Sequence, residues 1–353
     1  MYNAFQWWLV VAGFMGLWGC GAGKNDTDTV TSSTPPVTHC ENNEERKPHD
    51  PATVNTNALA STDSPAHPGF TSLAIGLTHT CGIRADNGQA LCWGFGDGGR
   101  ATPPMGVSFL VLSMSVDSIH TCGIRADNGQ ALCWGRNDYG QSVPPAGVKF
   151  INVSAGKYHT CGIRADNGHA MCWGSNEDSR RSEDNYAGQS EPPTNIKFTS
   201  LSAGSFHTCG IRTDNDQAVC WGSNDTGYEE VTNQSTPPAG VAFVSLSAGV
   251  YHTCGIVKDS DEARCWGWNE YDQSTPPVGI KFTSLSAGHR HTCGIVKDSG
   301  EARCWGRNNV GQSTPPAGVK FISVSLGHVH TCGIRAEDRV EVCWGQETRN
   351  MWK

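Results

Sequence analysis

Hydrophobic and polar residues alternate along short segments of this chain, and turn residues interrupt the alternation at regular intervals. Residues 148–154 alternate apolar and polar side chains, which is the pattern of a β-strand with one buried face. A turn at 155–158 leads into a second segment at 159–164, and a third follows at 170–174. Asp166-Asn167-Gly168 lies between the last two, and Asn and Gly tolerate the positive φ of a tight turn. The second and third segments therefore predict a β-hairpin.

This unit recurs seven times, and every copy contains His-Thr-Cys-Gly-Ile. The histidines are His79, His120, His159, His207, His252, His291 and His330, with steps of 41, 39, 48, 45, 39 and 39 residues. The basic period is therefore 39, and three units carry insertions of two, nine and six residues. A fourth strand is expected before each Pro-Pro pair, because proline at a strand boundary removes a ladder donor. Six such pairs begin at Pro103, Pro144, Pro192, Pro237, Pro276 and Pro315.

Seven four-stranded units predict an all-β protein, a seven-bladed β-propeller over residues 67–353. One sheet of this size cannot bury its faces alone, whereas radial stacking buries them. A helical-pair solenoid, the alternative for this period, would need an apolar spacing of 3.6 residues, which is absent. The last unit ends shortly after Trp344-Gly345, so residues 69–75 are expected to complete the final sheet.

The N-terminal region predicts export. Residues 4–18 form an apolar run that is short for a membrane span and has the size of a signal-peptide core, so residues 1–20 are interpreted as a signal. The run ends in Leu17-Trp18-Gly19-Cys20, which resembles a bacterial lipoprotein cleavage box with Cys20 as the lipidated residue. Because no basic residue precedes the run and Trp18 is bulky, a plain signal peptide, an uncleaved anchor and a misassigned start remain alternatives.

Residues 21–66 are polar and contain few residues to bury, so they predict a disordered linker. Cys40 within it is a free or intermolecular thiol if Cys20 is lipidated, and otherwise the two could pair. We expect a lipoprotein of the bacterial outer membrane or cell surface, or else a secreted or periplasmic protein. The membrane is then contacted only through the N-terminal lipid anchor.

Composition narrows the functional classes. The 353 residues include 42 glycines and 18 prolines, with 17% charged residues, as in a turn-rich β protein. A net charge of −8 offers no electrostatic footprint for a phosphate backbone, so nucleic acid is not an expected partner. An even set of 16 cysteines is typical of disulfides in an oxidising compartment.

Each unit carries two cysteines eleven positions apart, and the hairpin turn lies midway between them. A hairpin brings such residues within the Cα separation that a disulfide requires, for about 2 kcal/mol of stability each. Zinc held by the repeated histidine and the two sulfurs is the competing interpretation, but structural zinc normally takes four clustered ligands. The predicted disulfides are Cys81–Cys92, Cys122–Cys133, Cys161–Cys172, Cys209–Cys220, Cys254–Cys265, Cys293–Cys304 and Cys332–Cys343.

The units resemble the repeat of the regulator of chromosome condensation family over residues 67–353. Its signature, Trp-Gly-x-Asn-x-x-Gly-Gln, stands at residues 134–141 and 305–312, with degenerate copies after Trp173, Trp221 and Trp266. The first unit departs from it with Phe95-Gly96-Asp97. The resemblance implies a seven-bladed propeller, similar to cysteine-paired exported bacterial members, and a binding habit rather than a reaction. Some members exchange nucleotide on a small GTPase, which is a poor match to an exported acidic protein.

One face of the propeller is predicted to bind a partner. Strand parity places the turn before each repeated histidine and the loop after each third strand on the same face. The longest insertions fall in those loops, at 176–187 and 224–233. The predicted binding residues are Lys157, Tyr158, Phe206, Tyr251, His289, Arg290, Glu183, Asp184, Glu229 and Glu230. The competing interpretation is that the aromatic residues pack between blades.

The expected function is that of a non-catalytic scaffold that binds a protein, with a carbohydrate- or metal-binding surface as the alternative. No serine, carboxylate pair or phosphate-binding glycine loop stands at catalytic spacing, so no catalytic residue and no cofactor are predicted. The seven tryptophans that follow the second cysteines are expected to pack between blades. Two His-x-His runs, His289 with His291 and His328 with His330, could capture a transition metal, but no metal ligand is predicted.

Overall fold

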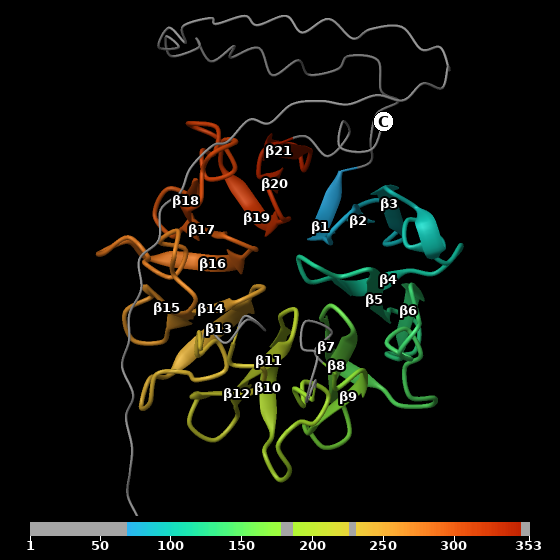
Figure 1. Cartoon of the computed structure of the whole chain (residues 1–353). Coiled ribbons are helices and arrows are strands. Elements are labelled where there is room, and N and C mark those ends of the chain that lie inside the picture. Colours follow the sequence, from blue (N-terminus) through green and yellow to red (C-terminus); the bar gives the residue numbers. More distant parts are fainter. Residues whose placement is uncertain (1–68, 178–185, 226–230, 347–353) are drawn as a thin grey trace, which may run out of the picture. The chain divides into compact units, whose positions relative to one another are not determined.

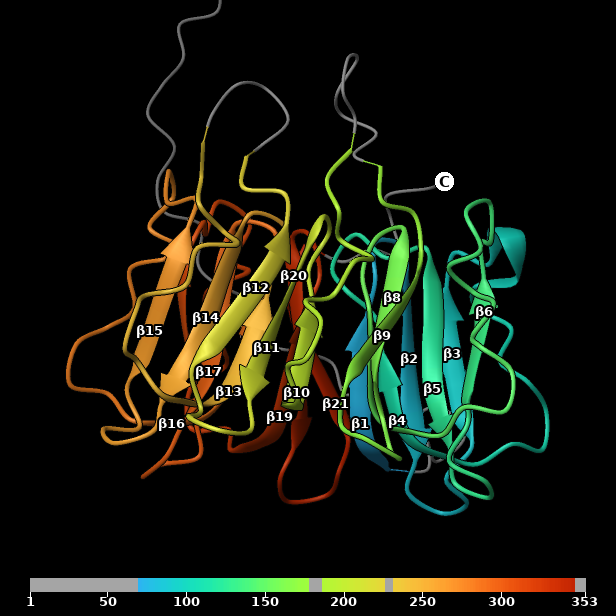
Figure 2. The ribbon, with the colours of Figure 1, turned by 90° about the horizontal axis from the view of Figure 1, so that it is seen from below.

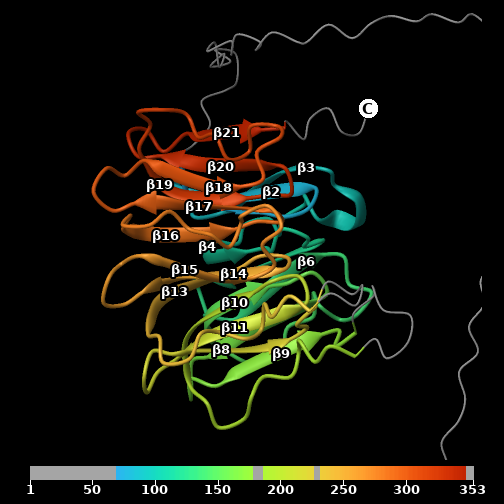
Figure 3. The same cartoon turned by 60° about the vertical axis from the view of Figure 1, so that its left-hand side comes forward.

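The computed structural model describes residues 69–177, 186–225 and 231–346, and these form seven antiparallel sheets arranged as blades around one axis (Figure 1). The prediction of an all-β, seven-bladed propeller is confirmed. The blades are β1 (Phe70–Ile75), β2 (His79–Arg84), β3 (Ala90–Gly94); β4 (Phe109–Ser113), β5 (His120–Arg125), β6 (Ala131–Gly135); β7 (Phe150–Ala155), β8 (His159–Arg164), β9 (Ala170–Gly174); β10 (Phe198–Ala203), β11 (His207–Arg212), β12 (Ala218–Gly222); β13 (Phe243–Ala248), β14 (His252–Val257), β15 (Ala263–Gly267); β16 (Phe282–Ala287), β17 (His291–Val296), β18 (Ala302–Gly306); and β19 (Phe321–Leu326), β20 (His330–Arg335), β21 (Glu341–Gly345). The turned view in Figure 3 shows successive sheets lying face to face.

Each blade has three strands, so the prediction of four strands per unit is wrong. Between β6 and β7 the chain forms turns instead of a ladder. The side chain of Asn137 accepts a hydrogen bond from the N–H of Ser142 at 3.0 Å, which closes a local loop. The Pro144-Pro145 pair that follows has no N–H to donate. Local side-chain bonds and missing donors therefore replace the fourth strand.

The ring closes without exchange of a strand between the two ends of the chain. Residues 70–75 are the first strand of blade one, so the expectation that residues 69–75 complete the final sheet is wrong. The N–H of Phe70 donates to the carbonyl of Arg339 in blade seven at 3.0 Å. The N–H of Phe150 makes the same bond to Gly129 of the preceding blade at 2.9 Å. Blade seven thus joins blade one as any blade joins its neighbour.

The hydrophobic core lies between neighbouring sheets. In one cluster, Ile83 of blade one packs with Phe109 and Trp134 of blade two. The indole Nε1 of Trp173 donates to the carbonyl of Gln141, in the loop that precedes its blade, at 2.9 Å. This confirms the prediction that the repeated tryptophans pack between blades.

The contacts of Gln141 show the structural role of the signature motif. Its side chain is fully buried, and its Oε1 accepts a hydrogen bond from the N–H of Tyr139 at 2.9 Å. Its carbonyl accepts from Trp173 Nε1 and also from Thr160 Oγ1, at 2.9 Å and 3.0 Å. The Trp-Gly-x-Asn-x-x-Gly-Gln segment is therefore a connector that bonds one blade to the next.

All seven predicted disulfides are present, each within one blade and between its second and third strands. The paired residues lie directly opposite in the antiparallel register, as Cys161 and Cys172 do with Cα atoms 4.0 Å apart. The one compact group of potential metal ligands in the described residues contains Cys332 and Cys343. These two sulfurs are bonded to each other, so they offer no thiolate to zinc.

Candidate functional site

The turns before the repeated histidines and the loops after the third strands share one face, which we call the insertion face (Figure 2). Backbone hydrogen bonds join the two sets directly. The N–H of Ser175 donates to the carbonyl of Tyr158 at 2.9 Å, and that of Arg307 donates to Arg290 at 2.8 Å. The face assignment made from strand parity is confirmed.

The seven repeated histidines, one from each blade, are buried and form a ring beneath this face. His159 Nε2 lies 2.8 Å from Thr208 Oγ1 of the next blade, and the equivalent contacts of the other blades measure 2.7–2.9 Å. The Thr208 hydroxyl donates its proton to the carbonyl of Gln189, so it accepts from His159 Nε2–H. His159 Nδ1 is then the unprotonated nitrogen, and it is buried with no hydrogen-bond partner among the described residues.

A proton on Nδ1 would therefore be buried without an acceptor. Burial lowers the pKa of the ring histidines from 6.5 to about 3 or about 4. The value is about 3 for His120, His159, His252 and His291, and about 4 for His79 and His330. These imidazoles are structural and neutral.

The two-residue insertion of unit two places a carboxylate on this face. Asp117 lies close to three other blades: its carboxylate is 3.1 Å from Ser205 Oγ, 3.9 Å from Lys157 Nζ and 3.5 Å from His328 Nε2. Asp117 is 7% exposed. Asp117 is not among the binding residues predicted from the sequence, although the insertion of two residues was the available signal.

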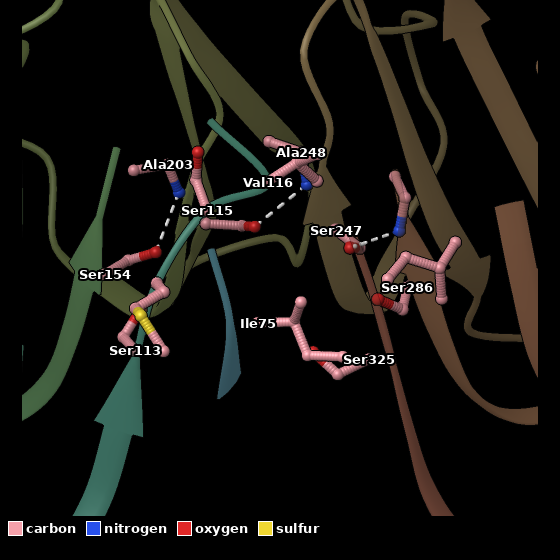
Figure 4. A pocket seen from close by; sticks show the side chains of 14 residues that line it. Ile75, Ser113, Ser115, Val116, Ser154, Ala203, Ser247, Ala248, Ser286 and Ser325 are labelled. Atoms are coloured by element: carbon pink, nitrogen blue, oxygen red, sulfur yellow. Dashed lines mark hydrogen bonds between the residues drawn. The ribbon is translucent and has the colours of Figure 1, made fainter. Parts of the chain in front are cut away.

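A cavity of about 140 Å³ lies on the axis (Figure 4). Serines of successive inner strands surround it, with Ser115 and Val116 also in its lining. Ser154 Oγ accepts the N–H of Ala203 at 2.8 Å, and Ser247 Oγ accepts that of Ala287 at 2.9 Å. These serines bond blade to blade, so the lining is primarily structural.

The predicted aromatic binding residues Tyr158, Phe206 and Tyr251 fall into two groups. In the first, the Tyr158 ring lies 5.1 Å from Tyr139 and 6.2 Å from Phe206, measured between ring centroids. Lys157 Nζ lies over Tyr158 and Phe206, at 5.2 Å and 5.0 Å from their centroids. Phe206 is only 1% exposed, so it supports the surface rather than forming it. Lys157 and Tyr158 are half-buried and reach the face.

The second group surrounds Tyr251, which packs edge-on against Trp268 with centroids 5.6 Å apart and lies 5.8 Å from His289. His289 in turn stacks on His328, with centroids 3.8 Å apart. Near-parallel stacked imidazoles do not direct their nitrogens at one ion, and His291 and His330 belong to the buried ring. The geometry therefore does not favour the metal site considered for the two His-x-His runs.

Arginines lie beside the second group. The guanidinium of Arg290 lies over the rings of Trp268 and Tyr271, with its Cζ 5.4 Å and 5.1 Å from their centroids, and its Nη1 donates to the Tyr271 hydroxyl at 3.4 Å. Arg307 lies over Tyr271 as well, with its Cζ at 5.3 Å. Of this group, Arg290 was predicted from the sequence as a binding residue, whereas Trp268, Tyr271 and Arg307 were not. The signal was the departure of unit five from the repeat, with Trp268 where units two and six have arginine.

Several predicted residues lie outside the described part of the chain. These are the acidic loop residues Glu183, Asp184, Glu229 and Glu230, and the lipidation residue Cys20. Among the described residues, no helix has the length and apolar character needed to cross a membrane.

Comparisons with known proteins agree with this architecture. The model of the regulator of chromosome condensation (RCC1) repeat matches residues 120–141, 150–180, 198–227, 243–273 and 282–312. The chain is similar to the ectodomain of the receptor kinase CR4 of Physcomitrella patens, with 30% identity, 78% of this chain and 74% of that chain covered, and a TM-score of 0.65.

Two other solved structures are also similar. The ectodomain of the Arabidopsis thaliana receptor kinase ACR4 is 28% identical, with 78% and 96% of the two chains covered and a TM-score of 0.64. Prp20p of Saccharomyces cerevisiae shares the fold at 16% identity, with 76% and 83% covered and a TM-score of 0.58. Among curated proteins, none matches the chain significantly.

Proposed function

Because this chain belongs to the family of regulator of chromosome condensation (RCC1) repeat propellers, we propose that it is an exported, non-catalytic scaffold that binds a protein partner on its insertion face. The family's fold carries binding rather than one reaction. The structural relative Prp20p is described by its binding to Gsp1p and histones, and two further relatives are receptor ectodomains. Protein binding is therefore the functional class that the relatives support.

Export is supported by the seven disulfides, since such bonds persist in oxidising compartments. The ectodomains of CR4 and ACR4 are extracellular relatives of the same fold. Acylation of Cys20 would then tether the propeller at a membrane surface. Mass spectrometry of the mature N-terminus tests that part of the proposal separately.

The observation that carries the choice of face is the contrast between the two ends of the blades. On the insertion face, Lys157, Tyr158 and Tyr251 are half-buried side chains that differ from unit to unit and rest on buried aromatic neighbours. At the opposite end the hairpin turns are polar, and blades one to four repeat one ion pair, such as Arg164 with Asp166. Partly buried anchors on a rigid base are typical of binding sites.

The test compares variants at the two ends of the propeller. Once a partner is isolated from extracellular fractions by cross-linking, Tyr158→Ala and Tyr251→Ala should each weaken its binding by about 1–4 kcal/mol. The melting temperature should change little, since both side chains reach the surface. Asn128→Ala and Asn167→Ala, in hairpin turns at the other end, are the matched controls and should leave affinity unchanged. Loss of affinity in these controls alone would place the site on the opposite face, and binding only to a glycan array would refute protein recognition.

A further inference from the structure

Two arginines of blade six carry charges that the described residues do not neutralise. Arg290 and Arg307 both lie over the Tyr271 ring, with Cζ 5.1 Å and 5.3 Å from its centroid. Neither forms an ion pair with a carboxylate in the described parts of the chain. Glu270 and Asp272 flank Tyr271 but are exposed and make no such pair. The two guanidiniums therefore present positive charge on the insertion face.

An equivalent position in another blade shows how this chain neutralises such an arginine. Arg136 of blade two corresponds to Arg307, and its Nε donates to the carboxylate of Asp138 two residues later. In blade six the residue two positions after Arg307 is Asn309, whose side-chain oxygen accepts from Gln312 Nε2 at 3.1 Å instead. The repeat keeps the arginine here and replaces the carboxylate with a neutral amide.

The charges around His328 indicate the same local excess of positive charge. Burial is the largest cause of its lowered pKa, and the charge of Asp117 opposes that shift. Arg290, Lys157 and Arg307 all lower the pKa of His328 further. Three cations thus act on one position of a chain whose net charge is −8. The positive charge is a local feature of the face.

Contacts with two aromatic side chains hold the guanidinium of Arg290 in place. Its Cζ lies 5.4 Å and 5.1 Å from the ring centroids of Trp268 and Tyr271, and one Nη1–H is used by the Tyr271 hydroxyl. Its Nε is buried and has no hydrogen-bond partner among the described residues. A guanidinium held in this way is preorganised for a planar, two-oxygen acceptor such as a carboxylate.

We propose that Arg290 and Arg307 bind the carboxylates of an acidic peptide segment, Asp- or Glu-rich, in the protein partner. This inference rests on the proposed function and specifies the chemistry of its ligand. A neutral glycan is disfavoured because stacking of a sugar ring requires an open aromatic face. Here Trp268 is only 8% exposed, and arginines lie over Tyr271. The arginine N–H groups, with Lys157 half-buried on the same face, suit a flexible chain bearing several carboxylates.

The probe is a fluorescein-labelled decapeptide of alternating Glu and Gly, measured by fluorescence anisotropy with the intact propeller. A peptide with Gln in place of Glu is the control ligand. Arg307→Gln and Arg290→Gln should each weaken binding of the Glu peptide by roughly tenfold or more, because each removes charge-assisted hydrogen bonds. Arg303→Gln, which removes an exposed arginine of β18, is the charge-matched control and should have little effect.

Asn309→Asp gives an independent test without removing either arginine. This change places a carboxylate beside Arg307, as Asp138 lies beside Arg136. It should therefore neutralise Arg307 and weaken binding of the Glu peptide as much as Arg307→Gln does. Because the change is on an exposed loop residue, it keeps the test valid if Arg290→Gln does not fold. Equal binding of the Gln peptide, equal loss in Arg303→Gln, or binding of a sulfated oligosaccharide but not the Glu peptide would each overturn the inference.

The two proposals fail in different ways. If an isolated partner binds and Tyr158→Ala weakens it, while Arg290→Gln, Arg307→Gln and the Glu peptide have no effect, the acidic-segment inference is wrong and the proposed function stands. If only the hairpin-turn variants affect the partner, the proposed face is wrong. Competition between the Glu peptide and the partner, lost in Arg307→Gln, would support both.

Discussion

Lowering the pH from 7 to 5 is expected to unfold this protein, because its ring of buried histidines resists protonation. His159 has a pKa of about 3 in the folded state, against 6.5 for an ordinary histidine. Between these two values the unfolded chain binds a proton at this site and the folded chain does not. Stability therefore rises with pH across this window and is lost as the pH falls below 6.5.

The size of the effect follows from the same two values. At pH 5 the unfolded chain is stabilised by about 2 kcal/mol for a histidine such as His159, since one pH unit corresponds to about 1.4 kcal/mol. Six ring histidines have lowered pKa values of about 3 or about 4. Their combined effect at pH 5 is about 12 kcal/mol, comparable with the total stability of an ordinary domain. Cooperative unfolding is therefore expected between pH 6.5 and 4.

The assay is urea unfolding followed by tryptophan fluorescence, with disulfides intact, at half-unit steps from pH 7.5 to 4.5. The slope of the unfolding free energy against pH gives the number of protons taken up. Several protons are expected near pH 5.5, and His159→Gln, whose amide can still donate to Thr208, should lower that number by about one. A flat profile from pH 7 to 5 would show that the folded ring accepts protons and would refute this account.

Three further predictions concern single blades. Arg339 has φ 61° where the hairpin turns of four other blades have glycine, such as Gly168 at φ 75°. Arg339→Gly should therefore stabilise the fold by about 1 kcal/mol in urea unfolding, and a lower midpoint would contradict this. Thr208→Val leaves His159 Nε2–H without its acceptor and should lower the free energy of unfolding by about 1–3 kcal/mol. Thr283→Val is the control, at a position that valine occupies in blade five, and it should change the free energy of unfolding little. Replacing Cys161 and Cys172 by serine together should cost about 2 kcal/mol of unfolding free energy, and an unchanged value would show that the hairpin alone supplies the constraint.

Much of the fold was predictable because it is encoded by local patterns. The period of 39, the alternation within strands and the cysteine spacing each depend on contacts within one unit, and all led to correct assignments. The missing fourth strand was not predictable in this way. It depends on Asn137 and Gln141, whose side chains bind backbone N–H groups and favour turns over a ladder. Periodicity does not report such bonds.

The face that carries the candidate site was predictable from the sequence, but the residues that form the site were not. Strand parity identified the insertion face, whereas the exposure of each residue depends on neighbours from other blades. Tyr158 and Phe206 occupy the same position in consecutive units, yet only Tyr158 reaches the surface. Asp117 contacts Lys157, Ser205 and His328 because the ring brings blades two, three, four and seven together. No spacing along the sequence encodes that convergence.

Internal repetition also separates structural residues from candidates for recognition. A side chain present in every unit, such as the histidine of the ring, is explained by a contact that every blade interface needs. A side chain that differs between otherwise equivalent positions has no such explanation. Arg136 and Arg307 are equivalent, and the change from Asp138 to Asn309 removes an ion pair while giving the buried Gln312 amide an acceptor. A neutralised arginine in one blade and an available one in another is the arrangement expected where a symmetric scaffold has acquired one asymmetric binding site.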